Sequence, residues 1–329
     1  MNLIWRTDVH MSDRTPRGRS DDWTETVVDK LCQVGEIARA VKAAAVLDGG
    51  DFFNDKNPDH NSHDLVRRTA KVHRSYPCPV YANVGNHDVR YGSLAHLDES
   101  PLSVCFESGI FRPCYGPHEV LLTDTDGTTV RIVGRPYQGA RFDPLSLRVD
   151  PGQEDHLVVM LHQLASADPS LTFFPGEDVL PYSLFPSLFP SASVVCVGHW
   201  HKDQGVREFA PGRWVVNIGS LTRGTLAEDD VNRVPQVAEL RLVKGAPAAV
   251  RTIAIDVGSP AEVFKDRQEV ADRTTVDVTC LAQVATAVAK EGRAQTLEDL
   301  VRALPNVSPE ARERVLDVFK RSESARLHP

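Results

Sequence analysis

The chain has 329 residues, of which 41% are hydrophobic and 25% charged, a composition typical of a globular protein with room for one large domain and an appendage. Residues 1–8 are too short and too polar for a signal peptide, and no stretch approaches the ~20 apolar residues of a membrane span, so we expect a cytoplasmic protein without membrane contact. The net charge of −8 argues against a dedicated DNA-binding protein, but not against an enzyme that contacts phosphates through metal ions and a local basic patch.

Six short apolar runs end in polar or glycine-rich turns, as buried strands do. They cover residues 3–5, 44–47, 79–82, 157–161, 194–197 and 214–216. Apolar residues at helical spacing occupy 21–45, opened by the acidic pair Asp21-Asp22, and 63–76, which is basic. The alternation of strands and helices predicts an α/β layered core.

Further elements follow the same signals. Residues 118–135 resemble a hairpin that turns at Asp126-Gly127, and 237–242 with 249–255 predict two strands around Lys244-Gly245. From Ser259 the pattern is helical, with segments at 280–290, 296–304 and 308–319. We therefore predict one domain over residues 1–258 and a helical C-terminal extension over 259–329.

Polar side chains with metal-binding atoms follow the first strands. Asp8 and His10 lie two residues apart on an extended segment, so both side chains are expected on one side of it. Asp51 follows Gly49-Gly50, and a carboxylate at such a position can bridge two cations. Each of these patterns is weak alone, because aspartate is common in turns.

The segment Gly85-Asn86-His87-Asp88 is the strongest local signal. The Asn86 side-chain oxygen is a neutral metal ligand, and His87 is the candidate proton donor or charge stabiliser. Asp88 is expected to hold the His87 imidazole in one tautomer. The alternative is an Asx-type turn beside a surface histidine.

Three more histidines follow predicted strands: His162, and the pair His199 and His201 in Gly198-His199-Trp200-His201. Each has an alternative as a capped, surface or partly buried histidine. Five of the twelve histidines fall in this ordered series. We interpret the others as surface or helix residues: His60, His63, His73, His96, His118, His156 and His328.

The mixture of carboxylate, amide and imidazole groups suits Mn²⁺, Fe²⁺ or Zn²⁺ and is too rich in nitrogen for Ca²⁺ or Mg²⁺. Two such ions about 3.5–4 Å apart can hold both the attacking and the leaving oxygen of a phosphoester. A hydroxide that bridges the ions would be the nucleophile, because coordination lowers the pKa of water.

The ordered set resembles the calcineurin-like metallophosphoesterase superfamily, whose motifs span Asp8 to His201 here. The resemblance implies a β-sandwich flanked by helices and assigns Asp8, His10, Asp51 and His201 to one metal. It assigns Asp51, Asn86, His162 and His199 to the other and makes His87 the catalytic histidine.

A narrower resemblance is to SbcD-type nuclease subunits of DNA repair complexes and their phage relatives. Residues 7–12, 49–53, 161–163 and 217–223 carry it. It implies a Mn²⁺-dependent DNA exo- and endonuclease, allows a homodimer, and gives the C-terminal helices a coiled-coil ABC-type ATPase (SbcC-like) as partner. The alternative for these helices is packing on the catalytic domain.

Two departures bear on the substrate. Family members often carry histidine where this chain has Asn54, and the segment after Arg223 is short for a DNA-capping domain. The basic residues of 67–74, and Arg6, Arg14, Arg17 and Arg19, are either a DNA-facing surface or a solvated one.

Three functions therefore stay open. The first is a DNA nuclease subunit. The second is a phosphodiesterase for small molecules such as cyclic nucleotides. The third, a metal-stabilised interaction module without activity, is disfavoured because every expected ligand and His87 are present.

Overall fold

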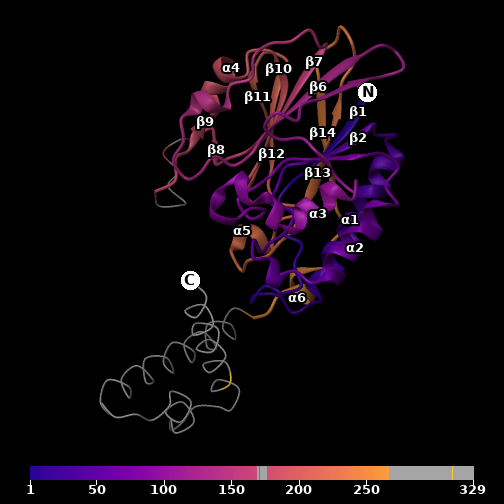
Figure 1. Ribbon diagram of the computed structural model, residues 1–329, viewed down its shortest axis with the longest axis vertical. Helices are drawn as coiled ribbons and strands as arrows, with labels where there is room; N and C mark the ends of the chain where they lie inside the picture. The colour runs from indigo at the N-terminus through magenta and orange to yellow at the C-terminus, as the bar shows by residue number, and fades with distance from the viewer. Residues whose placement is uncertain (169, 171–175, 267–312, 314–329) are drawn as a thin grey trace. The chain divides into compact units, whose positions relative to one another are not determined.

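Two six-stranded sheets with helices on their outer faces make up the fold, as Figure 1 shows. The computed structural model describes residues 1–168, 170, 176–266 and 313, and Met1–Phe264 form one compact unit. The first sheet has the order β14 (Ala249–Ala254), β13 (Gln236–Arg241), β1 (Asn2–Arg6), β2 (Ala45–Asp48), β3 (Val80–Ala82) and β4 (Arg112–Pro113). The second has the order β11 (Asp203–Ala210), β12 (Arg213–Ile218), β10 (Ala192–Gly198), β7 (His156–His162), β6 (Thr129–Arg135) and β5 (Val120–Thr123).

Among the described residues, all α-helices but two are short. They are α1 (Trp23–Ala40), α2 (His63–His73), α3 (Pro101–Glu107), α4 (Phe185–Leu188), α5 (Glu228–Val231) and α6 (Pro260–Val263). A third, two-stranded sheet pairs β8 (Ala165–Ser166) with β9 (Leu180–Pro181). No helix within the described ranges is both long and apolar enough to cross a membrane.

Alternation along the strands explains the layers. In β1, Leu3 and Trp5 pack into the core between the two sheets, whereas Ile4 packs against α1 on the other face. In β7, Val158 and Met160 enter the same inter-sheet core, and the intervening residues pack on the side of α4. Both faces of these central strands are therefore buried, which is why their sequences are continuously apolar.

All six predicted strand segments are strands, and the hairpin of β5 and β6 and the pair β13 and β14 also form as predicted. The α/β layered fold class is confirmed. Helix α1 ends earlier than predicted because Val41 caps it and Lys42 takes a positive φ of 52°. The predicted helices of 280–319 lie outside the described residues, apart from residue 313.

The short helix α6 belongs to the first compact unit. The backbone N–H of Ser20 donates to the carbonyl oxygen of Val263 at 3.0 Å, and Arg19 forms an isolated β-bridge with Phe264. The unit therefore extends six residues beyond the boundary predicted at residue 258.

A buried ion pair joins the ends of β1 and β2. The Arg6 Nε donates to Asp48 at 2.7 Å, and both side chains are fully buried. The other Arg6 nitrogens contact Tyr76 at 2.9 Å and His73 Nε2 at 2.8 Å, so the guanidinium is well satisfied. His73 is thus a helix residue, as predicted, but a buried one that contacts Arg6. The same prediction is wrong for His156, which is buried at the start of strand β7. Burial and Arg6 lower the pKa of His73 well below its usual value, so its neutral ring accepts from Arg6.

Replacing Asp48 with asparagine is expected to lower the free energy of unfolding by about 3–5 kcal/mol, because the buried Arg6 charge loses its counter-charge. The exposed pair of Arg148 and Asp150 offers a matched control, and Asp150→Asn should cost less than ~1 kcal/mol. Urea unfolding followed by circular dichroism measures both. Equal losses in the two variants would contradict the structural role of the buried pair.

Candidate metal centre

The candidate ligands lie at the carboxyl ends of parallel strands. Strands β1, β2 and β3 are parallel neighbours in one sheet, and β7 and β10 are parallel neighbours in the other. Beyond β1 and β2 the chains stay paired, since the N–H groups of Asp8 and His10 donate to the carbonyl oxygens of Gly50 and Asp51. Ligands distant in sequence therefore meet at one edge of the sandwich.

The first group consists of Asp8, His10, Asp51 and His201, whose ligand atoms all lie within 4.8 Å of one another. His201 Nε2 lies 3.7 Å from Asp8 Oδ1 and 2.9 Å from His10 Nε2. Burial and the neighbouring His201 lower the pKa of His10 to about 3. The His10 ring is therefore neutral near pH 7 and keeps a nitrogen lone pair for a cation.

The second group consists of Asp51, His162 and His199, and it shares Asp51 with the first. His162 Nε2 lies 3.4 Å from Asp51 Oδ2. Asn86 joins this group, because its side-chain oxygen lies 2.8 Å from His199 Nδ1. The structure thus brings together all seven predicted metal ligands and divides them as the resemblance implies.

The chemistry of His162 tests whether these residues fit a cation. Its Nδ1 lies 2.9 Å from the Gly49 carbonyl oxygen, which can only accept, so Nδ1 carries a proton. Its Nε2 is buried and has no hydrogen-bond partner among the described residues. In the neutral ring, the Nε2 lone pair faces an Asp51 carboxylate oxygen, which also carries lone pairs. The two atoms repel each other unless a positive charge lies between them. Without metal, a proton can supply it: burial opposes protonation, but Asp51 raises the pKa of His162 to about 9. The donor set therefore fits divalent cations.

Strained backbone is concentrated at the same residues. Asp8, His10, Asp51 and His199 have positive φ angles of 52°, 51°, 53° and 85°. A non-glycine residue in this region costs energy and persists only where its surroundings fix it. Space is also tight, since a Cβ on Gly85 would lie 2.1 Å from Asp51 Oδ1. The backbone is shaped to bring the side chains together.

His87 lies beside the first group. Its backbone N–H donates to Asp51 Oδ1 at 2.7 Å, and its ring centroid is 4.9 Å from that of His10. Its Nδ1 lies 2.7 Å from the carbonyl oxygen of Asn54, so Nδ1–H donates there. The remaining ring nitrogen, Nε2, has no hydrogen-bond partner among the residues that the structure describes.

The comparisons with known proteins agree with this geometry. The model of the calcineurin-like phosphoesterases matches residues 1–203, which is more than half of the chain. The chain belongs to this family. It is therefore a phosphoester hydrolase. The search of curated proteins found no match.

Several solved structures are similar to this phosphoesterase. The calcineurin-like phosphoesterase YfkN from Bacillus subtilis shares 13% identity over 83% of this chain and 94% of its own, with a TM-score of 0.47. A dimetal phosphatase from Danio rerio shares 13% identity over 78% and 99%, with a TM-score of 0.45. The protein TT1561 of Thermus thermophilus shares 12% identity over 78% and 99%, with a TM-score of 0.44.

Asp88 does not have the contacts expected of it. Its buried carboxylate accepts hydrogen bonds from the backbone N–H groups of Asp51, Phe52, Phe53 and Gly85, at 2.7 to 3.3 Å. The predicted role of orienting His87 passes to the Asn54 carbonyl oxygen. Asp88 instead holds the turn after β2 against the turn after β3, because its oxygens satisfy amides from both.

Three further residues contact the phosphoesterase site: Asn54, which the sequence analysis named only as a departure from the family, and Glu177 and Tyr137, which it missed. The Asn54 side-chain oxygen lies 3.1 Å from His10 Nδ1, so the residue contacts two imidazoles of the site. Glu177 lies 2.8 Å from His199 Nε2, and the Tyr137 hydroxyl donates to the same carboxylate at 3.3 Å. The ring of Tyr137 also packs on His199 with centroids 5.1 Å apart.

Buried residues of the remaining sequence motifs, Gln163 and residues 220–223, stabilise the turns of the site. Gln163 is buried and binds the backbone of Gln138 and Gly139. The segment 220–223 is also buried, and the N–H groups of Ser220 and Leu221 donate to the carbonyl oxygens of His201 and Thr7. These residues hold the ligand-bearing turns in place.

Several of the basic residues noted in the sequence have carboxylate partners within the chain. Arg67 and Arg68 both bind Asp64 on α2, and the buried Arg19 binds Asp21. These arginines are less available to phosphates than the sequence alone allowed.

Glu177→Gln is expected to weaken Mn²⁺ binding about 10- to 100-fold, because the carboxylate keeps the proton of His199 on Nε2 and so leaves the Nδ1 lone pair, beside the Asn86 oxygen, for a cation. Calorimetric titration of metal-free protein with Mn²⁺ measures the affinity. Glu119→Gln is a matched control, since Glu119 is an exposed partner of Arg131. Unchanged Mn²⁺ affinity in Glu177→Gln would remove Glu177 from the site.

Proposed function

We propose that this phosphoesterase is a metal-dependent nuclease that cleaves DNA phosphodiesters. The observation that carries the catalytic part is the Asp51 carboxylate shared by two ligand groups with His87 beside it. Asp8, His10, Asp51 and His201 would hold one divalent cation, and Asp51, Asn86, His162 and His199 the other. When bound, the cations would neutralise phosphate charge and activate water, with Mn²⁺ the expected ion and Fe²⁺ or Zn²⁺ as alternatives.

His87 would stabilise or protonate the leaving oxygen. Its Nδ1–H is engaged by the Asn54 carbonyl oxygen, which fixes the ring and directs Nε2 to the substrate. The backbone contact to Asp51 fixes His87 beside the carboxylate that both ligand groups share. Asp88 contributes indirectly, by holding the turn that carries Asp51.

His87→Ala should lower kcat by a factor of about 10²–10⁴, the usual contribution of a positioned acid, and leave Mn²⁺ binding within a few fold of wild type. Hydrolysis of bis-p-nitrophenyl phosphate and metal analysis of the same sample test the two halves. Retained hydrolysis would exclude the role proposed for His87. Lost metal would show that the residue is structural.

An exposed aromatic residue next to the motif favours a nucleic acid. Tyr91 is 84% exposed and has a φ of 57°, so a strained turn holds an aromatic ring largely in solvent, with the His96 ring 5.2 Å away. The adjacent Gly92 approaches Tyr137, which packs on His199. Aromatic rings in such positions stack on unpaired bases. The His201 side chain is 46% exposed, so the edge of the site is open to a large substrate.

Tyr91→Ala is expected to weaken cleavage of single-stranded DNA by about 5- to 100-fold, since base stacking contributes about 1–3 kcal/mol per base. Hydrolysis of bis-p-nitrophenyl phosphate, which has no base, should not change. Leu121→Ala on the outermost strand β5 is the control, because Leu121 is also exposed, at 65%. Equal loss on both substrates would reject stacking.

A phosphodiesterase for small molecules is the second candidate. The net charge of −8 favours it, because a protein with net negative charge repels DNA. A panel of linear DNA and cyclic nucleotides with Mn²⁺ separates the two functions. Turnover of cyclic nucleotides without DNA degradation, with or without a partner ATPase, would overturn the nuclease proposal.

From the sequence resemblance we also propose that 259–329 binds a coiled-coil ABC-type ATPase. The predicted contact helices of this segment lie beyond the described residues. Co-elution of the full chain, but not of a chain shortened after Phe264, with a coiled-coil ABC-type ATPase tests this. A shortened chain that still binds would place the contact elsewhere.

A further inference from the structure

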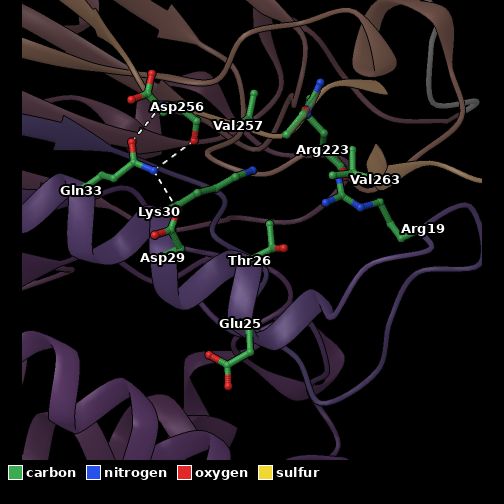
Figure 2. Close-up of a pocket in the computed structure, with 11 residues that line it drawn as sticks. Arg19, Glu25, Thr26, Asp29, Lys30, Gln33, Arg223, Asp256, Val257 and Val263 are labelled. Atoms are coloured by element: carbon green, nitrogen blue, oxygen red, sulfur yellow. Dashed lines mark hydrogen bonds between the residues drawn. The ribbon is translucent and has the colours of Figure 1, made fainter. Parts of the chain in front are cut away.

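A second pocket, of about 470 Å³, lies beside α1 and shares no residue with the two ligand groups (Figure 2). Three of its lining side chains are buried cations: Arg19, Lys30 and Arg223. In Figure 2 the Lys30 side chain extends from α1 towards the two arginines. Buried like charges repel one another, so a stable fold needs negative charges close to them.

Only part of this positive charge is balanced. Arg19 pairs with Asp21 at 2.7 Å, and the neighbouring Arg233 pairs with Asp230 at 3.2 Å. Among the residues that the structure describes, neither Lys30 nor Arg223 has a carboxylate within 4.0 Å. Neither charge therefore has a carboxylate in direct contact, although Asp230 acts on both from farther away and the Phe264 ring lies 5.4 Å from the Arg223 guanidinium.

The same two side chains have unused hydrogen-bond donors. The Lys30 ammonium has three donors, and Leu221 offers one carbonyl oxygen at 3.2 Å. Arg223 donates through its two terminal nitrogens to Val231 and Gly258, but its buried Nε has no partner within the described part of the chain. Leaving buried charged donors unsatisfied is costly.

We infer that this pocket binds a phosphate-type oxyanion, held by the Lys30 ammonium with the Arg223 guanidinium beside it. A phosphate carries up to two negative charges and several acceptor oxygens, which matches two unpaired cations with free donors. Burial and the nearby arginines lower the pKa of Lys30 to about 7. An anion beside Lys30 would restore the charged form.

The acidic residues at the edge of the pocket would repel a long anionic ligand. Glu25, Asp29 and Asp256 are exposed at its outer edge, and Glu25 pairs with Arg68. In Figure 2 the Glu25 carboxylate points away from Lys30, and Asp256 lies at the far end beside Gln33. This edge disfavours a long polyanion, so the ligand is a compact group, either free phosphate or the phosphate of a nucleotide.

Calorimetry with inorganic phosphate tests the site on the full chain, with and without Mn²⁺. Metal-free wild type should keep one phosphate site, which Lys30→Met should weaken at least tenfold. Lys71→Met, an exposed lysine on α2, is the matched control. No binding to metal-free wild type, or equal binding by Lys30→Met, would overturn the inference. The test reads binding without hydrolysis, so it is independent of the nuclease proposal.

Thermal unfolding guards against a merely misfolded variant. Phosphate should raise the Tm of wild type, but not that of Lys30→Met or of Lys30→Gln, which keeps a donor for Leu221. Without phosphate, Lys30→Met should be at least as stable as wild type, because an uncompensated buried charge is removed. A phosphate-dependent rise in both variants would reject the site.

A 5′-mononucleotide and a short single-stranded DNA distinguish the sources of the phosphate. Tighter Lys30-dependent binding of the mononucleotide than of inorganic phosphate would identify a nucleotide site, and the reverse a free-phosphate site. If only the DNA bound in a Lys30-dependent way, the inference that the pocket takes a compact phosphate group would be wrong.

Discussion

Buried negative charge is the constraint on which the site depends. Asp8, Asp51 and Asp88 are at most 1% exposed and lie within neighbouring turns. Asp88 is satisfied by four backbone amides, and Asp8 by the Thr7 hydroxyl and the His199 N–H. Asp51 receives the His87 N–H and faces His162 and His10. Asp88 needs no cation, because amides satisfy it, whereas Asp8 and Asp51 are buried among the ligand groups and need a positive charge beside them. These two charges would destabilise a metal-free fold and so favour metal binding.

The backbone meets this requirement through parallel strands and four strained residues. Parallel pairing of β1 with β2 and of β7 with β10 delivers the turns to one edge, and the Arg6–Asp48 pair lies directly before both turns that carry Asp8 and Asp51. Positive φ angles then turn the side chains inward. The stability of the two-sheet core therefore offsets the local strain, as expected where strain serves function.

Sequence patterns predicted the fold because each buried strand is a continuous apolar run that ends in a polar turn. They placed the ligands at strand ends for the same reason. Glu177 and Tyr137 could not be predicted, since neither lies on a strand with a periodic pattern and their value depends on contact with His199. Asp88 was given the wrong neighbour, because sequence adjacency to His87 says nothing of where a carboxylate points. Lys30 was unexpected because a charged residue on an amphipathic helix normally faces water.

Catalysis and substrate choice draw on different parts of this molecule. The metal-binding residues lie at the ends of the strands of the family fold. They account for hydrolysis of a phosphoester but do not determine which ester is cleaved. The groups that would meet the rest of the substrate, Tyr91 and the exposed edge at His201, lie on turns outside the sheets. With Arg67, Arg68 and Arg19 engaged by carboxylates of the chain itself, long-range attraction to phosphates is weak. A nucleic acid would then be held mainly by the metal centre and by stacking, which favours single-stranded ends over intact duplex, because only there are base faces accessible.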